Sequence, residues 1–174
     1  MAEKVSVLIA EEEVNRRIKE LGEIISKDYE GKKLHLVCVL KGGAYFMIEL
    51  AKYITVPVVI DFMALSSYGS GTTSAGRVKI LKDLDEPVQG KHVLIVEDIV
   101  DSGRTLSCLA SMFESREPAS IEICTLLDKP SRREIEVDVK YTGFEIPDAF
   151  VVGCGLDFDQ RYRNLPYVGV IDFE

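Results

Sequence analysis

The pattern of apolar and polar residues predicts an α/β protein in which strands and helices alternate. The first helix, expected from about residue 11 to residue 27, is amphipathic, because apolar residues recur at helical spacing among Glu, Arg and Lys: Val14, Ile18, Leu21 and Ile25. Apolar runs predict strands at 34–40, 58–63, 78–81, 93–96 and 121–127, with further helices at about 44–53 and 106–114. This alternation favours parallel crossovers, so we expect a mainly parallel sheet.

An acidic pair, Glu97 and Asp98, directly follows the apolar strand at 93–96. Because ligands of parallel sheets bind beyond the carboxyl ends of the strands, we expect this pair at the binding crevice. Ionised carboxylates only accept hydrogen bonds. An adjacent pair therefore complements the two hydroxyl donors of a ribose diol, and its oxygens also attract Mg²⁺.

A turn of small residues follows the pair and leads into the next helix; it contains Asp101, Ser102, Gly103, Arg104 and Thr105. Small residues allow backbone N–H groups to converge on an anion, and the positive end of the helix dipole adds to the attraction. The turn therefore predicts a site for a 5'-phosphate. A simpler interpretation, an acidic loop that caps the helix, accounts for Asp101 and Ser102 but not for the whole run.

Composition narrows the class of protein. At 174 residues the chain can bury a full core, and its 47% apolar and 29% charged residues are typical of a globular domain, so we expect one domain over residues 1–174. With 21 basic and 29 acidic residues, a net charge of −8 argues against a nucleic-acid partner. No apolar run has the length of a membrane span, and residues 1–13 do not resemble a secretory signal. We therefore expect a cytoplasmic protein without a membrane partner.

Several common chemistries lack their sequence signals. The chain has neither a GxxxxGK[ST] nor a GxGxxG phosphate loop in the required context. The cysteines form no CxxC pair and are expected to be reduced core residues: Cys38, Cys108, Cys124 and Cys154. The two histidines, His35 and His92, lie apart near strand starts, so neither a zinc cluster nor a Ser/His triad is expected.

The segment VEDIVDSGRT at 96–105 resembles the phosphoribosyl pyrophosphate (PRPP) motif of type I phosphoribosyltransferases. Nearly the whole chain is similar to the 6-oxopurine branch of that family, the hypoxanthine-guanine phosphoribosyltransferases, through LKGG at 40–43, LLDKP at 126–130, GFEIPDAFVVG at 143–153 and LDFDQRYRNLPYVGV at 156–170. The resemblance implies a central, mainly parallel twisted sheet flanked by helices. It also implies a small hood built from the chain ends, that is, the N-terminal residues and about 129–174.

The resemblance further implies a reaction and its participants. A purine salvage enzyme of this branch transfers the 5-phosphoribosyl group from PRPP to N9 of hypoxanthine or guanine, giving IMP or GMP and pyrophosphate, with Mg²⁺ as cofactor. The matching residues for the PRPP ribose and phosphate are Glu97, Asp98, Asp101, Ser102, Gly103, Arg104 and Thr105. Asp101 also matches the catalytic aspartate that accepts the proton from purine N7.

The same resemblance assigns the remaining ligand contacts. Those to pyrophosphate come from Lys41, Gly42 and Arg163, with a cis peptide bond between Leu40 and Lys41. The residues implied to contact the purine are Lys129, Phe150, Val151 and Asp157. The residues implied to hold the metal are Glu97, Asp98 and Asp157. An ammonium has only donors, so Lys129 would favour a 6-oxo group over the 6-amino group of adenine. Taken singly, Lys129 also fits a solvated lysine, Phe150 a core aromatic residue, and Asp157 with Arg163 a surface ion pair.

Residues 66–76, SSYGSGTTSAG, have no core pattern and match the mobile lid loop of the family, with Ser67 and Tyr68 at its Ser-Tyr pair. Closure of such a lid would exclude water from the reacting sugar. The alternative is a surface loop that does not respond to substrate. Arg104 stands where lysine is frequent in the family. Cys154 and Phe158 stand where many members carry tyrosine, so the question of whether xanthine is a substrate stays open.

Two other functions are compatible with this fold. One is a phosphoribosyltransferase for another base such as xanthine, and Lys129 with the segment 143–153 weighs against the more distant branches. The other is an RNA-binding regulator, which needs a basic face; Arg132 and Arg133 are too small a cluster for one. The family commonly forms dimers or tetramers, so we expect a homodimer or homotetramer.

Overall fold

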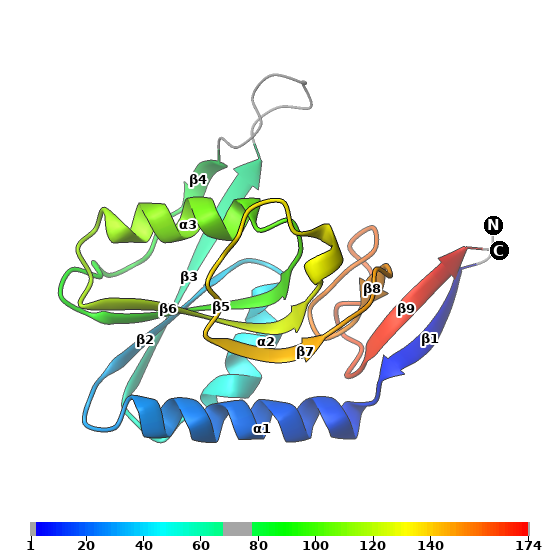
Figure 1. Ribbon diagram of the computed structural model, residues 1–174, viewed down its shortest axis with the longest axis horizontal. Helices are drawn as coiled ribbons and strands as arrows, with labels where there is room; N and C mark the ends of the chain where they lie inside the picture. The colour runs from blue at the N-terminus through cyan, green and yellow to red at the C-terminus, as the bar shows by residue number, and fades with distance from the viewer. Residues whose placement is uncertain (1–2, 68–77, 174) are drawn as a thin grey trace.

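The computed structural model describes residues 3–67 and 78–173, and its centre is a six-stranded sheet (Figure 1). The strand order is β4-β3-β2-β5-β6-β7. All neighbouring pairs are parallel except β3 with β4. The bounds are Leu34–Val39 for β2, Val58–Ser67 for β3, Val78–Lys82 for β4, His92–Val100 for β5, Ser120–Asp128 for β6 and Tyr141–Glu145 for β7.

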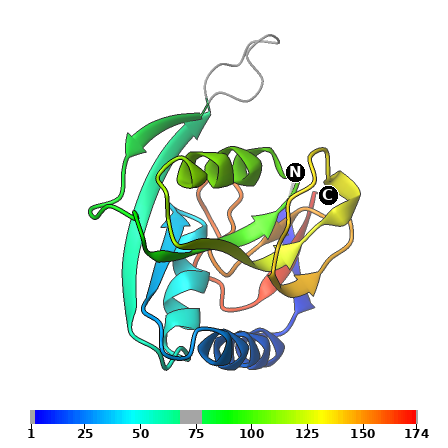
Figure 2. The ribbon, with the colours of Figure 1, turned by 60° about the vertical axis from the view of Figure 1, so that its left-hand side comes forward.

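Helices cover both faces of this sheet (Figure 2). On one face, α1 (Glu11–Asp28) and α2 (Gly43–Ala51) pack against the apolar side chains of the central strands. On the other, α3 (Arg104–Glu114) covers a second cluster that includes Val93 and Ile95. Because β5 supplies buried residues to both clusters, it is apolar on both faces, as its run of Val, Leu and Ile predicts.

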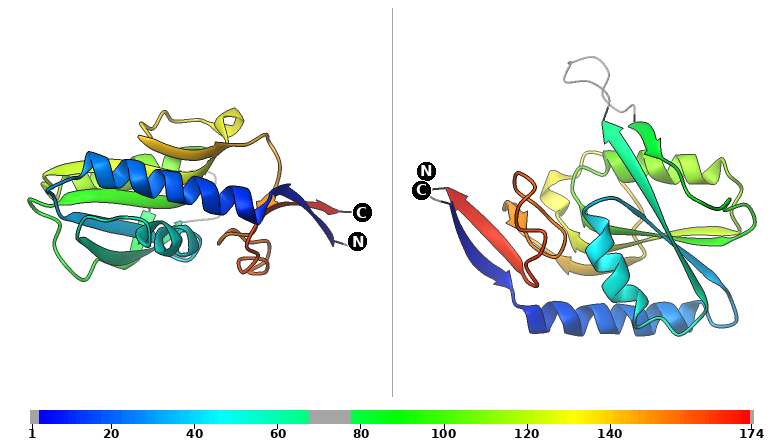
Figure 3. Two further views of the ribbon diagram at one scale, coloured as in Figure 1. Left: turned by 90° about the horizontal axis from the view of Figure 1, so that it is seen from below. Right: turned by 180° about the vertical axis from the view of Figure 1, so that it is seen from behind.

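The first and last described strands belong to a separate antiparallel sheet at one end of the molecule, where they pair with each other (Figure 3). Its order is β1-β9-β8, with bounds Glu3–Ile9 for β1, Val151–Val152 for β8 and Val168–Phe173 for β9. We call this sheet and the loop at 153–167 the hood. Strand β7 belongs to the six-stranded sheet, although its residues fall within the range 129–174 that was expected to contribute to the hood.

The expected helices and strands are present, with shifted boundaries. Strand β5 continues through the acidic pair to Val100, four residues beyond the predicted end, because its pairing with β6 extends to Val100 opposite Asp128. Helix α3 begins two residues early, at Arg104, after Gly103 with a positive φ of 84°. Ser67 is the last residue of β3, whereas Tyr68 and most of the predicted lid lie outside the described residues. No described helix combines the length and apolar character that a membrane crossing requires.

Candidate active site

The predicted phosphate turn lies between the carboxyl end of β5 and the amino end of α3. It surrounds a cavity of about 100 Å³ that is lined by Glu97, Ile99, Val100, Asp101, Ser102, Gly103, Thr105 and Leu106. The carbonyl of Gly103 accepts the hydrogen bond from Ser107 N at 2.9 Å, so the turn joins the helix directly. The cavity therefore has a helix amino end on one side and a carboxylate on the other.

A distant segment of the chain fixes the shape of this turn. The carbonyl of Ser102 accepts hydrogen bonds from the backbone N–H groups of Glu134 and Ile135, at 2.9 and 3.0 Å. A Cβ atom at Gly103 would overlap the carbonyl oxygen of Ile135. Glycine is therefore required at 103 for two reasons, its left-handed backbone and this close approach.

Glu97 and Asp98 are partly buried. Burial raises the pKa of Glu97 well above its ordinary range, and the neighbouring Asp98 raises it further. Burial also raises the pKa of Asp98, which the backbone N–H of Ile99 opposes with a hydrogen bond of 2.7 Å. Glu97 Oε1 is buried and has no hydrogen-bond partner among the described residues. A buried acceptor without a donor is costly to the fold, and a ligand donor or a cation would satisfy it.

The LKGG loop packs against this acidic pair. The peptide bond between Leu40 and Lys41 is cis, as the family resemblance implies. A Cβ atom at Gly42 would overlap the carboxylate of Asp98, and one at Gly155 would overlap the carbonyl oxygen of Gly42. Glycines at these two positions therefore allow the loop after β2, the end of β5 and the hood to meet.

On the hood, Asp157 and Arg163 form an ion pair with 3.0 Å between Oδ1 and Nη2. Arg163 also donates from Nη1 to the carbonyl of Gly155 at 2.7 Å. Because Gly155 contacts Gly42, the three residues predicted for pyrophosphate, Lys41, Gly42 and Arg163, lie in one region. The charges of Arg163 and Asp157 both influence the pKa of Asp98, which places the hood beside the acidic pair.

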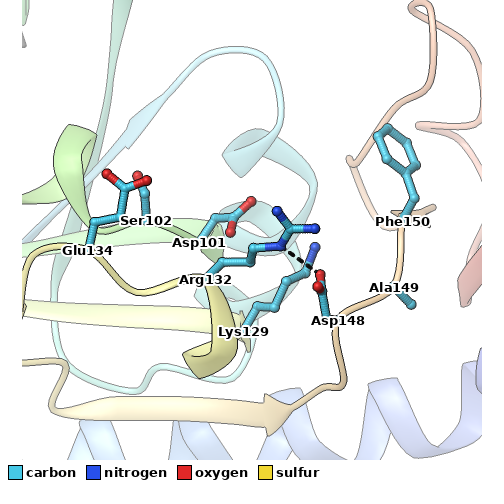
Figure 4. Close-up of a pocket in the computed structure, with 8 residues that line it drawn as sticks. All are labelled: Asp101, Ser102, Lys129, Arg132, Glu134, Asp148, Ala149 and Phe150. Atoms are coloured by element: carbon cyan, nitrogen blue, oxygen red, sulfur yellow. Dashed lines mark hydrogen bonds and ion pairs between the residues drawn. The ribbon is translucent and has the colours of Figure 1, made fainter. Parts of the chain in front are cut away.

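A second cavity, of about 470 Å³, shares Asp101 and Ser102 with the first. Figure 4 shows the residues that line this second cavity. Its other lining residues are Lys129, Arg132, Glu134, Asp148, Ala149 and Phe150. Lys129 follows β6 and is only 8% exposed. Phe150, 51% exposed, meets the ring of Phe158 edge to face, with 5.7 Å between the ring centroids.

Two of the four residues predicted for the purine line this cavity. Lys129 and Phe150 line the larger cavity, whereas Val151 is buried in β8 opposite Val170, and Asp157 lies with Arg163. Arg104, predicted to bind phosphate, does not line the smaller cavity and instead pairs with Glu134. That ion pair exists because the segment after Lys129 folds back over the turn.

Four residues of the larger cavity were missed by the sequence reasoning: Arg132, Glu134, Asp148 and Ala149. Arg132 donates from Nε to Asp148 Oδ1 at 2.8 Å, and this ion pair lowers the pKa of Asp148. The adjacent arginines at 132 and 133 were the available signal. Arg132 lines the cavity, and Arg133 bonds the carbonyl of Asp101 and pairs with Asp128.

Among the described residues, no group of three or more His, Cys, Asp or Glu side chains could hold a metal ion. Glu97, Asp98 and Asp157 therefore do not form a complete metal cage by themselves. Mg²⁺ commonly binds one or two carboxylates and completes its shell with substrate phosphates and water. The donor set fits a metal that arrives with a polyphosphate.

A family model described as a phosphoribosyl transferase domain matches residues 7–159, and the chain belongs to this family of enzymes. The hypoxanthine phosphoribosyltransferase of Salmonella typhimurium is 54% identical over 173 residues, covering 98% of this chain and 97% of the relative. The hypoxanthine-guanine phosphoribosyltransferase of Bacillus subtilis is 52% identical over 165 residues, covering 95% and 92%. A crystal structure of a hypoxanthine-guanine phosphoribosyltransferase from Bacillus anthracis superposes with a TM-score of 0.93 at 42% identity, covering 99% and 100%.

These similarities confirm the predicted α/β phosphoribosyltransferase fold, the predicted enzyme class and the resemblance to the hypoxanthine-guanine branch. They cover nearly the full length of the chain and of each relative, so the likeness includes the hood as well as the main sheet.

Proposed function

We propose that this enzyme transfers the 5-phosphoribosyl group of PRPP to N9 of hypoxanthine or guanine. The observation that carries the proposal is the pair of adjoining cavities that share Asp101 and Ser102. One cavity has the dimensions and donors for a phosphate beside an acidic pair, and the other holds a buried lysine and an exposed aromatic ring. A phosphorylated sugar and a planar oxo base would thus meet at Asp101.

On the sugar side, the backbone of the turn at 101–105 and the amino end of α3 bind the 5'-phosphate. Glu97 and Asp98 accept hydrogen bonds from the ribose hydroxyls, which satisfies the orphaned oxygen of Glu97. These contacts fix the sugar so that the base approaches C1' from the larger cavity. The alignment converts an encounter of two molecules into a reaction within one complex.

On the base side, Lys129 donates to the 6-oxo group and Phe150 stacks on the ring. As the bond from C1' to the pyrophosphate oxygen breaks, the bond from C1' to N9 forms, and the base releases its N7 proton. Asp101, which lines both cavities, accepts that proton. The buried position of Lys129 makes a mismatched amino group costly, because the ammonium would lose its acceptor.

The leaving pyrophosphate lies on the opposite side, where Lys41, the backbone at Gly42 and Arg163 stabilise its negative charge. Mg²⁺ would be held there by Asp157 and the acidic pair, together with oxygens of PRPP. When bound, it would offset the repulsion between the carboxylates and the polyphosphate. The protein residues bind the two substrates, align C1' with N9 and hold the proton on Asp101.

The test offers PRPP and Mg²⁺ with hypoxanthine, guanine, xanthine or adenine in parallel, and follows ultraviolet absorbance and pyrophosphate release. We expect hypoxanthine or guanine to be converted and adenine to be left unchanged. Fastest conversion of xanthine would favour the alternative base specificity. Absence of pyrophosphate release with every base would contradict the proposal, and tight RNA binding in its place would favour a regulator.

The proposed assembly is a homodimer or homotetramer. Apolar side chains on the outer surface of the described residues include Ile24 on α1 and Ile48 on α2, which are 44% and 43% exposed. Burial of such positions between copies would stabilise an oligomer. Sedimentation velocity at several concentrations distinguishes a monomer from these assemblies.

A further inference from the structure

Gln160, which has no role in the proposed reaction so far, joins the two cationic side chains of the proposed pyrophosphate region, Lys41 and Arg163. Its amide oxygen Oε1 accepts a hydrogen bond from Lys41 Nζ at 3.0 Å and another from Arg163 Nη2 at 3.4 Å. Lys41 comes from the loop after β2, whereas Arg163 lies on the hood, 122 positions further along the chain (163 minus 41). A single neutral oxygen thus links two segments that are remote in sequence.

The hood loop holds Gln160 in place independently of Lys41. The backbone N–H of Gln160 donates to Asp157 Oδ2 at 2.9 Å, while the other oxygen of this carboxylate pairs with Arg163. Gln160 also has a φ of 63°, in the left-handed region, within a turn closed by hydrogen bonds between Phe158 and Arg161. Asp157 therefore sets the positions of both Gln160 and Arg163.

Two like charges that converge on one point repel each other, and the exposed Lys41 side chain has the freedom to move away. An acceptor between the two cations opposes that repulsion. The resulting arrangement, an ammonium and a guanidinium directed at one oxygen, is the arrangement that a phosphate oxygen requires. An amide provides the acceptor without a charge, so it does not repel an incoming anion, which binds the N–H donors that the two cations do not direct at Gln160. A carboxylate would form stronger bonds and would repel the anion.

We propose that Gln160 is a positioning residue for pyrophosphate, which holds Lys41 and Arg163 together in the free enzyme and keeps these hydrogen bonds while other N–H donors of the two cations bind the phosphate oxygens. This inference rests on the proposed function, because it assigns the two cations to the pyrophosphate of PRPP. It adds to that function a residue that contacts neither the sugar nor the base and acts through Lys41.

The first variant is Gln160→Asn. Asparagine retains the amide and tolerates a positive φ, but its side chain is one methylene shorter and cannot reach Lys41. Loss of one exposed hydrogen bond, which contributes less than a buried charge-assisted one, predicts pyrophosphate binding weakened by about three- to tenfold, measured by calorimetry with pyrophosphate and Mg²⁺. The KM for PRPP is expected to rise similarly. The affinity for the nucleotide product, which carries no pyrophosphate, and the KM for the base are expected to stay unchanged.

A double-mutant cycle tests whether Gln160 acts through Lys41. In a Lys41→Met background, Gln160→Asn is expected to cause no further loss of pyrophosphate affinity. Gln160→Glu keeps the acceptor and adds a charge, so its deficit is expected to shrink as salt increases, whereas that of Gln160→Asn persists. The matched control is Gln89→Asn, at a glutamine whose side chain bonds Glu117 and which lines neither cavity of the site.

Equal pyrophosphate affinity in wild type and Gln160→Asn would overturn the inference, as would an undiminished loss in the Lys41→Met background. A change in nucleotide affinity as large as that for pyrophosphate would overturn it as well, because a general distortion of the hood would then explain the result. Failure of the wild-type enzyme to bind pyrophosphate would instead contradict the proposed function itself.

Discussion

The two halves of the proposed active site, one for the sugar and one for the base, are built in different ways. The sugar half comes from consecutive residues, as β5 runs through the acidic pair into the turn and α3. The base half is assembled from separate segments, the one that follows Lys129 and the one that ends at Phe150, joined by the ion pair of Arg132 with Asp148. A site built within one strand-turn-helix unit can be recognised from a short sequence motif. A site assembled from separate segments can be recognised only in the folded structure.

Arg133 connects the two halves. It donates from Nε to the carbonyl of Asp101 at 3.2 Å and forms an ion pair with Asp128 at the end of β6. Its side chain is only 13% exposed. The turn that the motif identifies therefore depends on a residue from the assembled half for its position. Mutations can separate the contributions of the two halves.

The largest effect is expected in the sugar half from Asp101→Asn. The variant removes the proton acceptor and keeps the size of the side chain, so kcat is expected to fall by about 10²–10⁴-fold. PRPP affinity, measured by calorimetry, is expected to be retained. Asp138→Asn, at an exposed aspartate outside both cavities of the site, serves as the control. Unchanged turnover in Asp101→Asn would show that its role is misassigned.

In the base half, Lys129→Met is expected to reduce the preference for an oxo group. Methionine fills a similar volume without a donor. The ratio of kcat/KM for hypoxanthine to that for adenine is therefore expected to drop about 10- to 100-fold, corresponding to one charge-assisted hydrogen bond. PRPP affinity is expected to be unaffected, and Lys140→Met at an exposed lysine is the control. An unaltered ratio would remove Lys129 from base recognition.

The connection between the halves is tested by Arg133→Met. This change leaves the carboxylate of Asp128 without its ion-pair partner, so the free energy of unfolding is expected to fall by about 1–3 kcal/mol in urea titrations. Arg132→Met removes an ion pair whose arginine is 61% exposed and is expected to cost at most about 1 kcal/mol. Equal losses in the two variants would contradict the special role of Arg133 in holding the turn.

The smallest effect is expected far from both halves, at His35 in β2, which is 3% exposed. Burial lowers the pKa of His35 below its ordinary value of 6.5. The unfolded chain therefore binds a proton near pH 6.5 that the folded chain does not bind, and stability falls as the pH drops below that value, by at most about 1.4 kcal/mol per pH unit. His35→Gln is expected to lose this part of the slope between about pH 7.5 and pH 5.5. Parallel curves for the variant and the wild type would contradict the assignment.

The sequence by itself determined the α/β class and most of the elements of the main sheet, and it located the proposed sugar half of the site, because these features follow from local periodicity and from a contiguous motif. Buried runs such as 93–96 identify strands, and an acidic pair at a strand end indicates where a ligand binds. The family resemblance extended the prediction to Lys129, Phe150 and the cis peptide bond at Lys41.

Only the tertiary structure decided which residues complete the site. The segment after Lys129 folds over the turn, so Arg104 pairs with Glu134 rather than lining the phosphate cavity. In the same way, Gln160 meets Lys41 only because the hood packs against the loop after β2. Contacts of this kind depend on the packing of segments far apart in the chain, and local patterns of residues do not encode the distances between such segments.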